Sequence, residues 1–153
     1  MPFNIREEFV KELQGLSLKN VEISIYNGKK QVFREFGEML FTHFGVSGPV
    51  VLSASSHLKK YREKKIKIHI DWKPALSDEQ LDQRLLRDFG QVLNKEFKNS
   101  LDHLLPKKAI PVMIGLSGIP EHKKVNEITK NERRKLRDAM KDFQLEVAGT
   151  RGF

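Results

Sequence analysis

The chain has 153 residues, of which 39% are hydrophobic, so it can bury one ordinary core or two small cores that share an interface. It contains no cysteine, which excludes disulfides and thiolate metal sites and favours a cytoplasmic location. No apolar run approaches the length of a membrane span, and the first residues, Met-Pro-Phe-Asn-Ile-Arg-Glu-Glu, have neither the basic nor the apolar part of a signal peptide.

Lysine and arginine outnumber aspartate and glutamate by 28 to 20, which gives a net charge of +8. A basic balance favours nucleic acid, anionic membranes or acidic ligands as partners. The excess is scattered over short groups: Lys59-Lys60, Arg62, Lys64-Lys65, Lys67, Lys107-Lys108, Lys123-Lys124 and Arg133-Arg134. Solvated faces and a binding patch both explain this distribution. We expect no specific binding of nucleic acid, because acidic residues interrupt the charge and the chain lacks exposed stacking aromatics.

The first half of the chain reads as a β-hairpin. Residues 6–14 predict a short helix or a turn, and a half-buried strand is expected over 20–26, where apolar and polar residues alternate. Asn27-Gly28 is the strongest short hairpin signal, because both central positions of a type I′ turn require positive φ. The return strand is expected over 30–41. Its apolar residues change phase, which predicts a bulge near Gly37.

The most distinctive stretch runs from Gly37 to Pro49 and reads Gly-Glu-Met-Leu-Phe-Thr-His-Phe-Gly-Val-Ser-Gly-Pro. It begins as the end of the return strand and ends in a turn rich in small residues, Gly45-Val46-Ser47-Gly48. Pro49 can open a helix, expected over 49–60, because the first helical turn has no use for its missing N–H. Such a turn has free backbone N–H groups that can bind an anion or dock another domain. A turn that only redirects the chain explains the pattern as well.

Familiar catalytic and cofactor motifs are missing from the sequence. Ser47 is not the nucleophile of a Gly-x-Ser-x-Gly elbow, because Pro49 occupies the position of the second glycine. His43 has no His, Asp or Glu near it at metal-ligand spacing, so it reads as a packed or surface histidine. The glycines never occur at i and i+2, so the dinucleotide fingerprint is absent. We therefore predict no metal site and no self-contained catalytic site.

The clearest strand covers 65–72, where four apolar residues alternate with polar ones. His69 lies on its polar side and is expected to face solvent. A last strand is expected over 143–148, and it must pair with the earlier strands because a strand is not stable alone. The chain then stops at Gly-Thr-Arg-Gly-Phe without a cap or a charged tail, which suggests a piece of a longer protein.

Between these two strands the apolar period changes from 2 to 3.6, so 77–142 predicts four or so short helices. Capping boxes at 77–80 and 129–132 open the first and the last of them. A second helical stretch is expected over 97–104, before a proline, and a third over 110–118. The leucine and phenylalanine residues that recur along these helices are most simply explained as buried core residues.

The stretch from Gly37 to Pro49 resembles the signature of the BaiN/YhiN-type flavoproteins, a family of FAD-dependent oxidoreductases of bacteria. Two other segments resemble the same family: Leu104-Leu105-Pro106-Lys107-Lys108-Ala109-Ile110-Pro111 with Leu116-Ser117-Gly118-Ile119, and the terminal Gly149-Thr150-Arg151-Gly152-Phe153. The resemblance runs from about Leu13 to Phe153. It corresponds to the middle insert domain of the family, not to its flavin domain.

The resemblance implies an α+β fold, in which an antiparallel, translation-factor-like β-barrel over 1–75 and 143–153 carries an all-helical subdomain over 76–142. It implies FAD in the parent protein but none in this chain, because the Gly-rich phosphate loop of the family precedes the matched region. The chain would cover the flavin domain of the same polypeptide and help to shape the site of an unknown small-molecule substrate, without catalysis of its own and without a membrane. The alternative is an independent basic binding module for nucleic acid or another anionic partner.

The candidate site is the turn that would face the flavin domain or the substrate, formed by Thr42, His43, Phe44, Gly45, Ser47 and Gly48. Polar side chains there are combined with glycines that let another backbone approach closely. The following helix begins there and favours a negative charge. A purely structural account stays open, in which the glycines make the turn while Thr42 and Ser47 bond local backbone groups.

Overall fold

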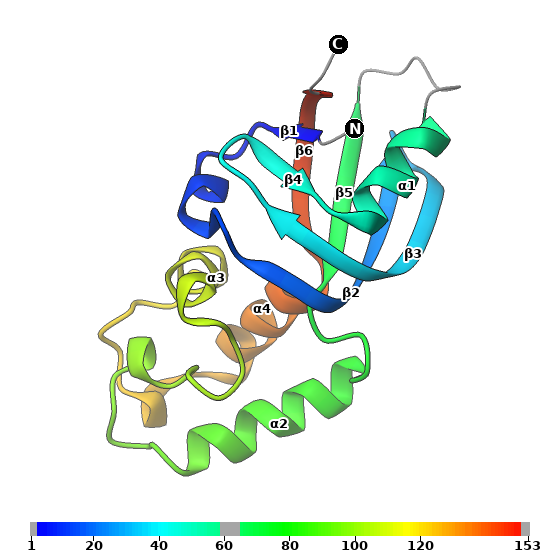
Figure 1. Cartoon of the computed structure of the whole chain (residues 1–153). Helices are drawn as coiled ribbons and strands as arrows, with labels where there is room; N and C mark the ends of the chain where they lie inside the picture. The colour runs from blue at the N-terminus through cyan, green and yellow to red at the C-terminus, as the bar shows by residue number, and fades with distance from the viewer. Residues whose placement is uncertain (1–2, 59–64, 151–153) are drawn as a thin grey trace. The chain divides into compact units, whose positions relative to one another are not determined.

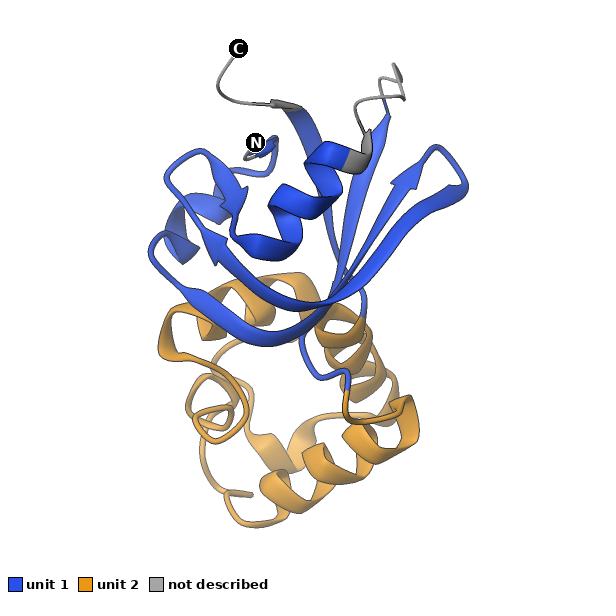
Figure 2. Ribbon diagram, turned by 45° about the vertical axis from the view of Figure 1, so that its right-hand side comes forward, with its two compact units in different colours: residues 1–74, 142–153 blue, residues 75–141 orange. Residues whose placement is uncertain are grey.

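The computed structural model describes residues 3–58 and 65–150. The chain divides into two compact units, Met1–Pro74 with Asp142–Phe153, and Ala75–Lys141 (Figure 2). The end of the expected helix at 59–60, most of the basic group at 59–65 and the terminal residues 151–153 lie outside the described residues.

Six antiparallel strands close into a barrel in the order β1-β4-β3-β2-β5-β6 (Figure 1). They are β1 (Phe3–Ile5), β2 (Ser17–Asn27), β3 (Lys30–Phe41), β4 (Gly45–Ser47), β5 (Ile66–Asp71) and β6 (Phe143–Thr150). β6 pairs with both β5 and β1, so the last strand closes the barrel. This architecture confirms the expected α+β fold with an antiparallel barrel and a helical part.

Alternate residues of the long strands point into the barrel, as the period of 2 predicts. Ile23 and Ile25 of β2, Ile68 and Ile70 of β5, and Leu145 of β6 are fully buried. Full burial of one such side chain contributes roughly 1.5–3 kcal/mol relative to its exposure. The interior of the barrel is therefore the main source of stability for this unit.

The β2–β3 hairpin differs in detail from the expected turn. Asn27 still pairs with Lys30, so the two-residue loop is Gly28-Lys29 rather than Asn27-Gly28. Only Gly28 has a positive φ, 62°, which suits a type II′ turn and not type I′. The bulge expected near Gly37 is present, but its extra residue lies on the facing strand β2.

The expected turn over Gly45–Gly48 is instead a strand followed by a single turning residue. The chain reverses at 42–44, and β4 then pairs with β3 on one side and with β1 on the other. Gly48, with φ of 109°, leads into α1 (Pro49–Leu58), which begins at the expected proline. A strand forms here because β1 needs a second neighbour if the barrel is to close.

The segment before β2 is a 3-10 helix, η1 (Glu8–Leu13), which is one of the two alternatives expected over 6–14. Val10 and Leu13 of η1 are buried, so the helix packs its apolar side inwards. α1 packs against β3 and β4 with Val51 and Ala54 buried. These two short helices therefore add apolar side chains to the core of the barrel unit.

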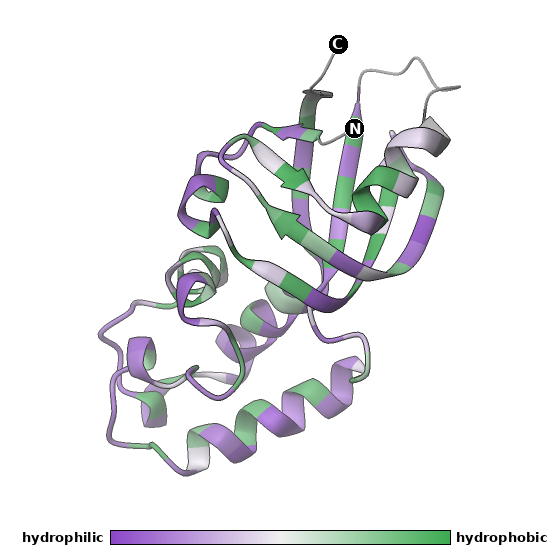
Figure 3. Cartoon of the chain, in the orientation of Figure 1, coloured by the Kyte–Doolittle hydropathy of each residue, from purple (hydrophilic) through white to green (hydrophobic). Residues whose placement is uncertain are grey.

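The second unit contains α2 (Asp78–Gly90), α3 (Ile110–Ser117) and α4 (Lys130–Lys141). Three 3-10 turns join them: η2 (Phe97–Asn99), η3 (Lys107–Ala109) and η4 (Val125–Glu127). Hydrophobic and polar residues alternate along α2 (Figure 3), and Leu81 and Leu85 on its apolar side are fully buried. The helical part is therefore built around amphipathic helices, as the period of 3.6 predicts.

Both predicted capping boxes are present. Ser77 Oγ accepts from Gln80 N at 3.1 Å while Gln80 Oε1 accepts from Ser77 N at 2.9 Å, and Thr129 and Glu132 exchange the same two bonds. The expected helix over 97–104 is wrong, because only η2 forms there. Ser100 Oγ donates to the carbonyl of Phe97 at 2.7 Å, a local side-chain bond that competes with a longer helix.

Candidate functional site

The six candidate residues are divided between the tip and the base of one hairpin. Thr42, His43 and Phe44 form the reversal between β3 and β4. Gly45 and Ser47 lie within β4, and Gly48 follows it. Of the six, only the histidine and the phenylalanine at the tip are exposed.

Thr42 has a structural role at this tip. Its backbone N–H donates to the carbonyl of Gly45 at 2.8 Å, and its Oγ1 accepts from Gly45 N at 3.1 Å. The two bonds close the reversal from both sides. Thr42 therefore bonds local backbone groups, as expected if the turn has only a structural role.

The two glycines of the turn approach the backbone of their own barrel. A Cβ on Gly45 would clash with the carbonyl of Phe3 and lie 2.9 Å from Ile5 N, both in β1. A Cβ on Gly48 would lie 2.9 Å from the Cα of Met39. The space that each glycine provides is therefore already filled. This turn does not fit the pyrophosphate of a dinucleotide, which needs open backbone N–H groups.

A pocket of about 290 Å³ opens beside the tip, with residues of β1 and η1 on one side and His43 and Phe44 on the other. His43 Nδ1 lies 3.3 Å from Gln14 Oε1, and the histidine ring meets the Phe44 ring edge-on at 4.8 Å. Asn4 Oδ1, on the β1 side, is buried without a hydrogen-bond partner among the described residues. The pocket thus offers one exposed aromatic ring and one imidazole, beside charged residues of both signs from the β1 and η1 side.

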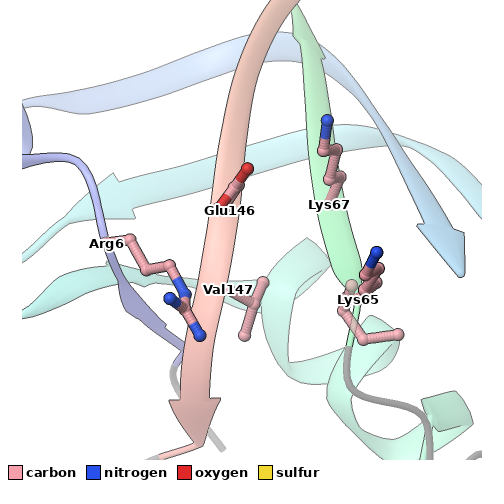
Figure 4. A pocket seen from close by; sticks show the side chains of 6 residues that line it. Arg6, Lys65, Lys67, Glu146 and Val147 are labelled. Atoms are coloured by element: carbon pink, nitrogen blue, oxygen red, sulfur yellow. The ribbon is translucent and has the colours of Figure 1, made fainter. Parts of the chain in front are cut away.

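A second pocket, of about 330 Å³, lies beside the end of the β5–β6 ladder, where Lys67 pairs with Glu146, and Ile66 and Val147 also line it (Figure 4). Arg6 lies on one side of β6, Lys67 projects from β5, Lys65 directly precedes β5, and Glu146 projects from β6 itself. Three cations against one carboxylate make this pocket attractive to anions.

The sequence gives no local signal for this pocket, because its residues are far apart in the chain. Barrel pairing brings them together: Lys67 is the register partner of Glu146, and Arg6 N donates to the carbonyl of Glu146 at 3.0 Å. Lys65 and Lys67 belong to the scattered charges noted in the sequence. Nothing in the sequence around Arg6 marks it as part of this group.

His69 lies on the outer side of β5 as expected, but it is not plainly exposed. Its Nδ1 lies 2.6 Å from Asp142 Oδ1, and 22% of its side chain is exposed. The Tyr26 ring packs against the imidazole with 4.4 Å between ring centroids. Gln144 Nε2 donates to the other oxygen of Asp142 at 2.9 Å. The expectation of simple solvent exposure for His69 is therefore wrong.

The helical unit carries its own ion pairs. Lys123 Nζ donates to Glu132 Oε1 at 2.8 Å, and this bond lowers the pKa of the glutamate. The pair supports the cap of α4, since the same oxygen accepts from Thr129 N. Within residues 3–58 and 65–150 no three His, Asp or Glu side chains are placed to hold a metal ion. None of the helices in those ranges is long and apolar enough to cross a membrane.

A six-stranded barrel whose fifth and sixth strands are separated by a helical unit defines a particular class of two-part domain. The chain belongs to the family described as HI0933-like protein barrel and H2TH domain, which matches residues 1–153. This membership confirms the resemblance to the BaiN/YhiN-type flavoproteins. The family description also agrees with the two parts seen in the fold.

Three curated relatives are enzymes. The chain is 29% identical over 160 residues to the ribosomal RNA dihydrouridine synthase of Escherichia coli (strain K12) and 31% identical over 156 residues to that of Haemophilus influenzae. It is 26% identical over 136 residues to the 3-dehydro-bile acid delta(4,6)-reductase of Clostridium scindens. The alignments cover 100%, 100% and 88% of this chain, but only 36%, 35% and 33% of the relatives. The chain therefore spans about a third of the length of the curated relatives it matches.

Proposed function

We propose that this chain is the middle domain of a bacterial FAD-dependent reductase and is not catalytic by itself. The observation that carries the proposal is the match of the barrel and helical unit, over 88% or 100% of the chain, to about a third of each related enzyme. The rest of the polypeptide would supply the flavin domain. The chain would cover that domain and shape the substrate site beside it.

The glycines of the chain support the assignment of FAD to another domain. The sequence has no Gly-x-Gly-x-x-Gly, and Gly45 and Gly48 are filled by backbone of β1 and β3. Reduced FAD would supply the hydride for a reduction, while this chain would contribute binding surface and exclude water. We also propose a cytoplasmic location for the enzyme, since the chain has no cysteine.

The hairpin tip is the part that we propose faces the flavin domain. Phe44 is 48% exposed, although it is a large apolar residue at the rim of the pocket beside β1. Aromatic side chains next to a pocket often contribute much of the binding energy of a protein–protein interface. His43, in contact with that ring, offers a nitrogen to the substrate or to the partner domain.

For the substrate we propose ribosomal RNA rather than a small molecule. Two relatives that match the whole chain are named ribosomal RNA dihydrouridine synthases, whereas the bile acid reductase matches 88% of it. The pocket at Arg6, Lys65 and Lys67 adds a basic surface whose several cations suit the repeated phosphates of an RNA backbone better than the single carboxylate of a bile acid. This proposal departs from the expected small-molecule substrate and from the expected absence of specific nucleic-acid binding.

The experiment compares two proteins and two substrates. The whole natural polypeptide that carries this chain is purified beside the 153-residue chain alone, and the flavin absorption of both is measured. We expect a yellow whole polypeptide and a colourless chain. Ribosomal RNA from a strain that lacks the gene is then analysed for dihydrouridine before and after the gene is restored.

The outcomes separate the candidates. Dihydrouridine that disappears with the gene and returns with it supports the RNA substrate. Unchanged ribosomal RNA, together with reduction of a 3-dehydro-bile acid by the purified enzyme, favours the bile acid alternative. A chain that binds flavin stoichiometrically without the rest of the polypeptide contradicts the assignment of FAD to another domain.

A further inference from the structure

We propose that the outer face of the sheet formed by β3, β2, β5 and β6 binds a single-stranded segment of RNA. We call this surface, together with Lys65 and Arg6 of the adjoining pocket, the aromatic–basic face, and its main residues on the strands are Phe36, Tyr26, His69 and Lys67. The inference rests on the proposed function, because it assigns a place on this chain to an RNA substrate.

Strand pairing arranges the outward residues of the face in rows. One row holds Gln31, Tyr26, Lys67 and Glu146, and the next holds Arg34, Ser24, His69 and Gln144. Phe36 lies one step further along β3, opposite Glu22. Neighbouring strands are about 4.8 Å apart, so four strands give a surface about 15 Å wide. A four-stranded sheet with outward aromatic side chains is a surface on which two or three RNA bases can stack.

Phe36 and Tyr26 are the rings on this face that a base would stack on, and the half-buried His69 supports the Tyr26 ring. Tyr26 and His69 form one unit, with their rings 4.4 Å apart and tilted by 45°. Phe36 is 57% exposed, the highest value among the exposed large hydrophobic residues of the described chain. The expectation that exposed stacking aromatics are lacking is therefore wrong. Stacking on such rings tolerates every base, because every base has a π-face.

The cations lie at one end of the same face. Lys67 stands in the first row beside Tyr26 and also lines the pocket with Arg6 and Lys65. The pocket holds one carboxylate, Glu146, against these three cations. A strand of RNA that stacks on Tyr26 would carry its phosphates into this pocket, where the charges are complementary.

The remaining acidic residues of the face are already hydrogen-bonded within the protein. Glu22 Oε1 accepts from Arg34 Nε at 2.7 Å, and Asp142 Oδ1 lies 2.6 Å from His69 Nδ1. Asp71 Oδ1 accepts a backbone N–H at 2.9 Å. These bonds compensate part of the negative charge near the rings. The net attraction for phosphate is therefore concentrated at the pocket.

The first test measures the electrostatic contribution to RNA binding. A fluorescein-labelled single-stranded oligouridylate is titrated with the whole natural polypeptide, and its anisotropy is followed at several KCl concentrations. The double variant Lys65→Gln, Lys67→Gln should bind more weakly. Its slope of log K against log salt should be smaller by about 1.4, since each phosphate contact on a single strand contributes about 0.7.

The second test measures the stacking part. Phe36→Ala and Tyr26→Leu each remove one ring, and each should weaken oligouridylate binding by about tenfold, the range found when a stacked aromatic is truncated. Their salt slopes should stay at the wild-type value, because no phosphate contact is lost. A merely structural defect would not separate affinity from salt slope in this way.

Matched controls lie in the helical unit. Lys130→Gln, Lys135→Gln removes the same charge from exposed positions of α4, and Leu86→Ala truncates a side chain on α2 that is 48% exposed. Both should leave affinity and salt slope unchanged. If the α4 variant loses as much as the β5 variant, or if duplex RNA binds as tightly as the single strand, the aromatic–basic face is not the site.

The result is distinguishable from failure of the proposed function. An enzyme that makes dihydrouridine in ribosomal RNA while all face variants bind and react as wild type overturns this inference alone. An enzyme that reduces only bile acids and does not bind oligouridylate overturns both. Loss of binding in the face variants with unchanged flavin content supports the inference.

Discussion

Arg133 Nε donates to Asp82 Oδ1 at 2.7 Å, and Nη2 of the same arginine reaches Oδ2 at 3.3 Å. This two-point bond ties α4 to α2 inside the helical unit. The arginine side chain is 13% exposed and the aspartate 25%, so the pair is largely shielded from water. The hydrogen bond from Arg133 holds the pKa of Asp82 below its ordinary value.

This pair makes the helical unit sensitive to acid. Because the pKa of Asp82 is lowered on folding, its contribution to stability is present above the unfolded pKa and is lost as the pH falls through the folded one. Asp82→Asn should cost about 1–2 kcal/mol of unfolding free energy near pH 7, and the cost should decrease as the pH falls below the ordinary pKa of an aspartate, for example at about pH 3. Urea denaturation at both pH values measures this change in unfolding free energy.

Asp138→Asn, at an exposed position of α4, is the control. An equal loss at both pH values would contradict the linkage.

Close packing of β4 on β1 predicts the effect of a single methyl group. Gly45→Ala should destabilise the barrel by about 1–3 kcal/mol, because the new Cβ would meet the backbone of Phe3 and Ile5, which cannot move without opening the sheet. The control is Gly90→Ala, which meets no atom within 4 Å and should be neutral or slightly stabilising. The midpoint of urea denaturation reports both. Equal midpoints for the two variants would show that β1 does not lie against β4.

Loss of a capping box should loosen one end of the helical unit. Ser77→Ala and Thr129→Ala each remove the hydroxyl that accepts an N–H of the first helical turn, at a cost of about 1 kcal/mol each. Ser53→Ala, at an exposed position inside α1, is the matched control and should change little. Amide hydrogen exchange at the first turns of α2 and α4 should rise in the variants. Unchanged protection there would argue against the caps as determinants of these helix ends.

The hairpin tip should affect the enzyme more than the fold. In the whole polypeptide, Phe44→Ala should lower turnover or flavin retention by about tenfold, the effect of truncating an interface anchor. Thermal stability should stay near wild type, since the side chain is 48% exposed. His43→Ala tests the neighbouring imidazole, and Leu93→Ala is a control of equal exposure on the other unit. Wild-type flavin content, reduction rate and turnover in both tip variants would leave the hairpin with a structural role alone.

The elements that the sequence predicts well are those with their own local signals. The period of 2 in β5 and the capping boxes before α2 and α4 each depend on residues close together in the chain. β1 and β4 have three residues each, which is too short for a period to show. They are strands because of their neighbours in the barrel, and this is why Gly45–Ser47 reads as a turn in the sequence.

The two candidate surfaces also differ in whether they have a local signal in the sequence. His43 and Phe44 belong to one contiguous motif, and the sequence alone brings them forward. Arg6, Lys67 and Glu146 meet only through the β5–β6 register and the return of β6 to β1. The exposure of Phe36 depends on which side of β3 faces out after the shift in pairing with β2. The phase change within 30–41 predicts a bulge, but it does not show that β2 carries the extra residue, and so it does not show which side of β3 faces out.

Closure of the barrel by β6 has a consequence for the order of synthesis. β1 to β5 leave the ribosome first, the whole of Ala75–Lys141 follows, and Phe143–Thr150 comes after it. Until β6 arrives, β5 has an unpaired edge, the kind of edge that recruits foreign strands. Translation adds roughly 5–20 residues per second, so the nascent sheet stays open for several seconds. Slow codons within 75–141 would lengthen the time for which the β5 edge is unpaired. A chaperone that binds the nascent chain and covers this edge would prevent foreign strands from pairing with it.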